Sequence, residues 1–175
     1  MIQAGSMGVP FLAVRGLLHS DILKYRPDLL IQDNPFNPGE QVVVAQAIRP
    51  DVAVFHALRA DRWGNAITPG PRDDVMLARA ARHVIVTAEM VVDTPLTPGD
   101  AVGDTFLAAI DVDTVIEVPL GAHPCGLGRM YEPDAQHCQE YLTAAKTEEA
   151  FNAYLNRYVF GANTQEAYLA QIETR

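Results

Sequence analysis

The chain has 175 residues, of which 49% are hydrophobic and 20% are charged, and its formal net charge at pH 7 is −9. This length suits one domain with a sizeable core. The negative charge, which no basic patch offsets, excludes binding to nucleic acid or to an anionic membrane surface. The sequence lacks both a run of about 18 apolar residues and the positive start of a signal peptide, so we expect neither a membrane span nor export. Two cysteines, Cys125 and Cys138, do not make a disulfide scaffold, and we therefore expect a cytoplasmic protein.

Short apolar runs separated by Pro, Gly and Asn predict strands in the first part of the chain. A short helix is expected at residues 19–25, with Ser20 as its N-cap. The segment 33–41 is rich in Pro, Asn and Gly, which predicts a loop. The runs that predict strands cover residues 8–16, 41–48 and 49–57.

From residue 71 onward, helical and strand patterns alternate. Residues 71–82 predict a helix capped by Asp73 or Asp74, and the β-branched run that follows from His83 predicts a strand covered on both faces of a parallel sheet. A further strand is expected at 112–119. The chain then turns helical, and the expected helices cover residues 132–146, 147–160 (with a capping box at Thr147) and 163–173. This order predicts an α/β fold with a mainly parallel sheet, flanking helices and a helical C-terminal tail.

Polar residues cluster where four of the expected strands end. These clusters are Arg15–Gly16, the run from His56 to Asn65, Glu89, and the stretch around His123. In open α/β sheets, ligands bind beyond the carboxyl ends of the strands. The sequence therefore predicts a binding site at this edge of the sheet.

Several of these residues have two interpretations from the sequence alone. Arg15 can clamp a carboxylate by bidentate hydrogen bonding, or it can pair with Asp21. His56 ends an apolar run, where a histidine is either a hydrogen-bonded core residue or a catalyst. Glu89 lies in an apolar run, so its carboxylate must be paired or must lie at the exposed end of a strand.

The run between His56 and Asn65 also holds Arg59, Asp61, Arg62 and Trp63. These residues can form surface ion pairs, fix the loop, or form a subunit interface, in which Trp and Arg are enriched. We favour loop fixing or an interface over chemistry.

Histidines and cysteines near the start of the helical tail invite a zinc interpretation. Their spacing matches no common zinc pattern, so we predict no metal site. The sequence also lacks the glycine-rich and nucleophile motifs of nucleotide-binding proteins and hydrolases. The residues concerned are His123, Cys125, His137 and Cys138.

An ordered set of short motifs resembles the alpha subunit of class I CoA-transferases, most closely the glutaconate CoA-transferase group. A related type is the alpha subunit of a ring-opening CoA-thioester hydrolase of steroid degradation. Each motif is weak alone, but their order is specific, and the resemblance extends from Met1 to about Val159. The motifs are "GVPFLAVRG", "DNPFNPGE", "PDVAVFHALRADRWGNA", "HVIVTAEMVV", "VDTVIEVPLGAHP", Tyr131 with Asp134, and "YLNRYV".

This resemblance implies a fold shared with sugar-phosphate isomerases, an obligate beta subunit of similar fold, and acyl-CoA chemistry with coenzyme A as substrate and no other cofactor. In the transferases the thioester is attacked by a glutamate of the beta subunit, so we expect no catalytic residue in this chain. The substrate-binding residues that the motif positions imply are Arg15, Ser20 and Asp21, followed by His56, Asn65, Glu89 and His123.

The chain begins inside the family pattern. We therefore expect residues 1–175 to form one CoA-transferase alpha-subunit-like domain that lacks the N-terminal half of the pattern. Three functions remain open at this point: CoA transfer, CoA-thioester hydrolysis on the same scaffold, and a non-catalytic binding fragment.

Overall fold

The computed structural model describes residues 1–173. The chain groups into two compact units, Met1–Glu117 and Val118–Arg175. Within the part that the structure describes, no helix combines the length and the apolar character that a membrane crossing requires.

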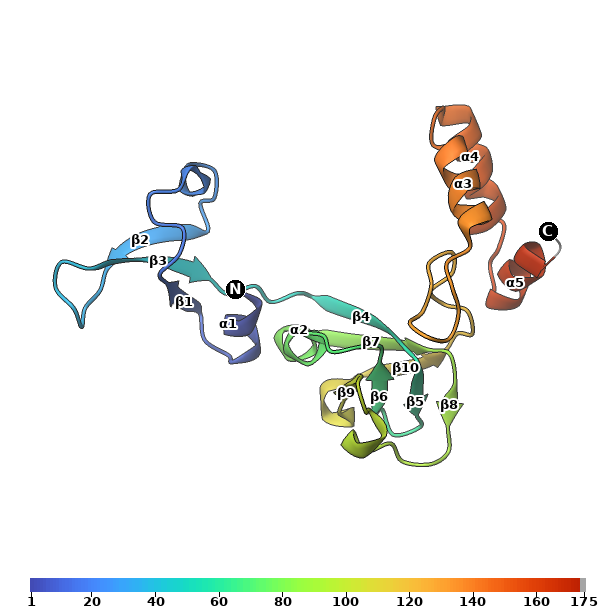
Figure 1. The fold of residues 1–175 in the computed structure, drawn as a ribbon, viewed down its shortest axis with the longest axis horizontal. Helices are drawn as coiled ribbons and strands as arrows, with labels where there is room; N and C mark the ends of the chain where they lie inside the picture. The colour runs from blue at the N-terminus through green and yellow to red at the C-terminus, as the bar shows by residue number, and fades with distance from the viewer. Residues whose placement is uncertain (174–175) are drawn as a thin grey trace. The chain divides into compact units, whose positions relative to one another are not determined.

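A three-stranded parallel sheet forms the centre of the first unit, with strand order β10-β7-β4 (Figure 1). Its strands are β4 (Val52–Ala57), β7 (His83–Ala88) and β10 (Thr114–Glu117). All three lie inside the runs of the sequence that predicted strands. The register pairs His56 with Thr87 and Ile116 with Thr87, so one face of the sheet gathers these three residues.

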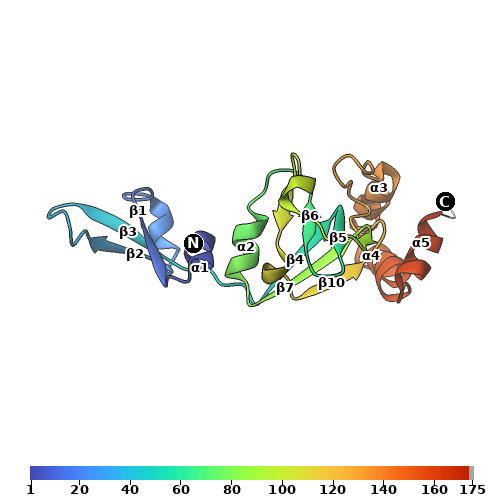
Figure 2. The same ribbon diagram turned by 90° about the horizontal axis from the view of Figure 1, so that it is seen from below.

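One face of this sheet is packed and the other is open. Ala53, Phe55 and Val86 belong to the buried cluster on the packed face, together with Ala78 of helix α2 (Asp74–Ala80), which lies beside β4 in both views (Figures 1 and 2). On the other face, Val54 is 63% exposed. The run from His83 was predicted to be covered on both faces. In β7 burial instead alternates, with Val84, Val86 and Ala88 buried and Ile85 and Thr87 only partly buried, so this prediction is wrong within the described residues.

Four short strands form a second sheet beside the carboxyl ends of β4 and β7, with strand order β8-β5-β6-β9. None of them was predicted as a separate strand, because runs of two or three residues carry too little periodicity; β8 falls at the end of the run from His83 that predicted one strand. The 3₁₀ turns η2 (Pro98–Asp100) and η3 (Ala109–Asp111) connect this region. The strands are β5 (Arg59–Asp61), β6 (Ala66–Thr68), β8 (Val91–Val92) and β9 (Thr105–Leu107).

The N-terminal strands form a separate antiparallel sheet with order β1-β3-β2. Leu29, Val43 and Ala45 are buried on one of its faces. The predicted loop at 33–41 connects β2 to β3, and the predicted helix at 19–25 is a 3₁₀ turn that Ser20 caps, as expected. The elements are α1 (Ile2–Ser6), β1 (Phe11–Val14), η1 (Asp21–Lys24), β2 (Leu29–Asp33) and β3 (Gln41–Gln46).

Helix α1 packs against α2, and Gly5 makes this close approach possible. A Cβ on Gly5 would lie 2.2 Å from the carbonyl oxygen of Ile48 and 3.1 Å from the Cβ of Ala80. Only glycine fits such a backbone contact.

The second unit is helical, as the tail of the sequence predicted. Thr147 caps α4 by accepting a hydrogen bond from the N–H of Ala150, and Asp134 caps α3 in the same way through the N–H of His137. Its helices are α3 (Ala135–Ala144), α4 (Glu148–Leu155), the π-helical turn η4 (Asn156–Phe160) and α5 (Gln165–Glu173).

Candidate functional site

His56 and Glu89 meet at the carboxyl end of the parallel sheet. His56 lies in β4, and Glu89 directly follows β7. The His56 Nε2 atom is 2.7 Å from Glu89 Oε1, and the two side chains are 15% and 7% exposed. The sequence placed both residues at strand ends, and the structure pairs them there. The carboxylate is paired, as a buried carboxylate must be.

Thr87 completes this group by bonding to the other ring nitrogen. Its Oγ1 lies 2.8 Å from His56 Nδ1 and 3.3 Å from the carbonyl oxygen of Phe55. The Thr87 hydroxyl donates to the Phe55 carbonyl, and its oxygen lies beside His56 Nδ1, while Glu89 Oε1 lies beside Nε2. Both ring nitrogens are thereby used, so His56 orients Glu89. Thr87 was not singled out from the sequence, because only the register of β4 against β7 reveals its place.

Asp61 organises the tight turn between β5 and β6. It is fully buried, and its Oδ1 accepts hydrogen bonds from the N–H groups of Trp63 and Asn65, each at 2.9 Å. Its Oδ2 accepts from the Asn65 side-chain amide at 2.7 Å and from the Leu96 N–H at 2.8 Å. Gly64, with φ +105°, supplies the left-handed step of the turn. Within the described residues Asp61 forms no ion pair of the kind considered from the sequence, because backbone N–H groups and the Asn65 amide satisfy its carboxylate.

Burial alone would raise the pKa of the Asp61 carboxyl. The hydrogen bonds from the Asn65 side chain and from the N–H groups of Leu96, Asn65 and Trp63 outweigh burial and hold this pKa below its usual value. The Asp61 carboxylate is therefore a fixed anion at neutral pH.

Asn65 belongs to this turn. Its side-chain oxygen accepts a hydrogen bond from the N–H of Ala109 at 2.9 Å, while its amide donates to Asp61. Both ends of the side chain thus fix the loop, which agrees with the loop-fixing interpretation of this run.

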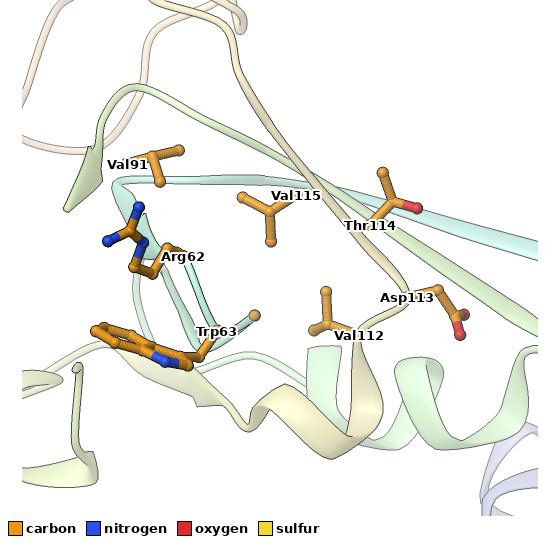
Figure 3. Close-up of a pocket in the computed structure, with 8 residues that line it drawn as sticks. Arg62, Trp63, Val91, Val112, Asp113, Thr114 and Val115 are labelled. Carbon is orange, nitrogen blue, oxygen red and sulfur yellow. The ribbon is translucent and has the colours of Figure 1, made fainter. Parts of the chain in front are cut away.

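The same turn projects Arg62 and Trp63 toward a small cavity of about 250 Å³. Figure 3 shows these two side chains on one side of it and Val112 and Val115 on the other. Arg62 pairs at 3.3 Å with the exposed Asp93, and the Trp63 side chain is about half exposed. None of the seven predicted substrate-binding residues lines this cavity.

Arg15, Ser20 and Asp21 lie in the antiparallel sheet region. Arg15 is 3.9 Å from Glu40, and its side chain is 91% exposed, so it pairs with Glu40 instead of with Asp21, the partner that the sequence suggested. Asp21 pairs at 2.5 Å with Lys24, and the Ser20 hydroxyl caps η1. Arg15 follows an antiparallel strand, so the expectation that it ends a strand of the parallel sheet is wrong.

His123 belongs to the second unit. Its Nδ1 lies 2.7 Å from the Tyr168 hydroxyl, and its Nε2 lies 3.1 Å from Asp134 Oδ2. His137 stands edge-on to the His123 ring, with centroids 4.9 Å apart, and its Nε2 lies 2.6 Å from the Tyr154 hydroxyl. His123 thus ties the segment after β10 to the helices of its own unit.

Among the residues that the structure describes, the group placed to hold a metal ion is His123, Asp134 and His137. Each offers one ligand atom, and these atoms lie within 4.8 Å of one another. The zinc set considered from the sequence contained Cys125 and Cys138 instead of Asp134; both thiols are free. A hydrogen-bond network with Tyr154 and Tyr168 already uses the three polar side chains, so the arrangement has a structural explanation without an ion.

A model of the coenzyme A transferase family matches residues 1–102, which is more than half of the chain. The chain therefore belongs to the coenzyme A transferase family. The match includes the whole β4–β7 edge, with His56, Thr87 and Glu89.

The alpha subunits of two CoA-transferases resemble nearly the whole chain. That of 3-oxoadipate CoA-transferase from Pseudomonas knackmussii is 34% identical over 170 residues, which cover 97% of this chain and 59% of the relative. That of glutaconate CoA-transferase from Acidaminococcus fermentans is 31% identical over 188 residues, which cover 98% and 58%. The chain thus spans about three fifths of the length of these relatives.

The crystal structure of glutaconate coenzyme A-transferase from the same bacterium matches the fold with a TM-score of 0.85 at 29% identity, over 98% of this chain and 59% of that one. This match confirms the predicted α/β fold.

Related proteins with other reactions also match. The crystal structure of a variant of the decarboxylase AibA/AibB gives a TM-score of 0.74 at 32% identity, over 89% of this chain and 57% of that one. The IpdA subunit of a cholesterol ring-cleaving hydrolase from Rhodococcus jostii is 29% identical over 98% of this chain and 60% of the relative.

Proposed function

We propose that this chain is the alpha subunit of a heteromeric enzyme that moves CoA between an acyl-CoA thioester and a carboxylic acid. The observation that carries this proposal is the similarity of nearly the whole chain to the alpha subunits of two CoA-transferases. The partner is a beta subunit, and coenzyme A enters as a substrate. The two free cysteines suit a reducing compartment, and we place the enzyme in the cytoplasm.

A glutamate of the beta subunit is the proposed nucleophile. Its carboxylate attacks the thioester carbonyl carbon and expels the CoA thiolate, which leaves a mixed anhydride. The thiolate then attacks the carbonyl of that glutamate and releases the acyl group as a carboxylate, so that CoA is held as an enzyme thioester. An acceptor carboxylate takes up CoA by the reverse steps. Every covalent state stays activated, and no proton is gained or lost.

Because this cycle needs no proton transfer, the residues of this chain serve to bind and orient. In the proposal, the carboxyl end of the parallel sheet, with His56 and Glu89, faces the reacting thioester, in keeping with the usual place of ligands on open α/β sheets. Asn65 supports that edge through Asp61. Arg15, Ser20, Asp21 and His123 remain proposed contacts of the assembled enzyme.

Thioester hydrolysis is the second candidate, because a chain of a ring-cleaving hydrolase is also similar to this one. The complex of this chain with its copurified partner is incubated with an acyl-CoA, with and without isotopically labelled carboxylic acids. Transfer predicts labelled acyl-CoA in amounts equal to the acid released, with no accumulation of free thiol. Release of free CoA without an acceptor acid would instead establish hydrolysis.

A further inference from the structure

The carboxyl end of the parallel sheet is acidic. Glu89 directly follows β7, and Glu117, the last residue of the neighbouring strand β10, accepts a hydrogen bond from the N–H of Val91 at 2.8 Å. Two carboxylates therefore stand at the ends of adjacent strands. In a chain with a net charge of −9, this end of the sheet repels phosphate groups.

Coenzyme A has two chemically different ends. One carries the nucleotide and its phosphates, and the other is an uncharged arm of methylene and amide groups that ends in the thiol. The amide N–H groups of this arm are hydrogen-bond donors, and a carboxylate is a strong acceptor. An acidic edge flanked by apolar side chains therefore suits the uncharged arm, and Val54 and Ile116 supply such side chains on the open face of the sheet.

The Glu89 carboxylate is preorganised for this contact. His56 holds Oε1 at 2.7 Å, and Thr87 fixes the His56 ring through its second nitrogen at 2.8 Å. With its side chain only 7% exposed, Glu89 has few rotamers left to lose when a ligand binds. A hydrogen bond to a charged acceptor in such a setting is worth more than one between neutral groups.

We propose that Glu89 accepts a hydrogen bond from an amide N–H of the uncharged arm of the acyl-CoA thioester, with His56 as the positioning residue of Glu89. This inference rests on the proposed CoA-transferase function. It assigns to this chain the recognition of the arm next to the thioester, and it leaves the nucleotide end to other surfaces of the enzyme.

The test compares thioesters of one acyl group with three thiols in the copurified complex: coenzyme A, pantetheine and ethanethiol, which lacks the amides. Glu89→Gln should raise KM about 10-fold for the CoA and pantetheine thioesters, the effect of losing one hydrogen bond to a charged group. The kcat/KM of the ethanethiol thioester and the KM of the acceptor acid should not change. Asp93→Asn, at an exposed carboxylate two residues beyond Val91, is the matched control and should leave all three thioesters unaffected.

Variants at His56 separate positioning from folding. His56→Ala should raise KM for the same two thioesters, and His56→Gln, whose amide can still donate to Glu89, should restore part of the loss. If Glu89→Gln does not fold, these two His56 variants test the proposed role of Glu89 in its place. Equal effects on all three thioesters, or no effect in a folded variant, would overturn the inference.

Failure of this inference is distinguishable from failure of the proposed function. If the wild-type complex moves no CoA, calorimetric binding of the pantetheine thioester to wild type and Glu89→Gln replaces KM as the readout. Weaker binding by the variant then supports the inference, and equal binding contradicts it.

Discussion

Asp61 explains, at the scale of single residues, why so many polar side chains follow β4. Its buried carboxylate collects four hydrogen bonds and fixes the turn that presents Arg62 and Trp63. A surface ion pair, the other interpretation of this run, would have left the Asp61 side chain exposed to solvent, whereas it is fully buried. The neighbouring pair of His56 and Glu89 instead connects two strands and carries the proposed recognition of substrate.

Removal of the Asp61 carboxylate should destabilise the fold. Asp61→Ala leaves the N–H groups of Leu96, Trp63 and Asn65 without their acceptor. This loss should lower the free energy of unfolding by about 3 kcal/mol, or Tm by about 10 °C for a chain of this size. Thermal unfolding followed by the fluorescence of Trp63, the single tryptophan, measures the effect locally. A change below about 1 °C would contradict this account of the turn.

The acid dependence of stability should also report Asp61. Its pKa is lowered in the folded state, so its contribution is complete above the usual carboxyl pKa of about 3.9 and is lost as the pH falls through the folded-state pKa. The free-energy difference between wild type and Asp61→Asn should therefore be largest near neutral pH and shrink below about pH 4. A free-energy difference that stays constant between neutral and acidic pH would contradict the lowered pKa of Asp61 in the folded state.

At the scale of elements, the sequence predicted what periodicity and caps encode. The strands β4, β7 and β10 and the helices α3 and α4 have clear patterns and were predicted. Strand β2 was missed because its residues, LLIQD, show neither an alternating pattern nor a β-branched run. The meeting of His56 with Glu89 could be predicted from the rule for strand ends, whereas Thr87 depends on register, and Arg15 was misplaced because its strand pairs antiparallel.

Helix caps offer a paired test at this scale. The Thr147 side chain accepts a hydrogen bond from Ala150, whereas Asp73, at the start of α2, makes no side-chain capping bond, contrary to the expectation for this position. Thr147→Ala should lower the stability by about 1 kcal/mol, or about 3 °C, and Asp73→Ala should leave it unchanged. Equal losses in thermal unfolding would contradict the assignment of the caps.

At the scale of the whole molecule, family membership and the site lead to one account. The chain belongs to the coenzyme A transferase family, and its open sheet edge combines a fixed carboxylate with apolar side chains. Motif order identified the family from the sequence, because several short motifs in one order are far more specific than any one of them. The substrate acid could not be predicted, since the sequence pattern records strand ends and turns but not the shape of a binding cleft.

The central claim is that this chain works beside a second subunit that carries the nucleophile. The most direct measurement is the intact mass of each chain in the complex purified through a C-terminal tag on this chain, after incubation with an acyl-CoA. We predict a second kind of chain that gains the mass of covalently bound CoA, while the mass of this chain stays unchanged. A CoA adduct on this chain, or a preparation that contains this chain alone, would contradict the account.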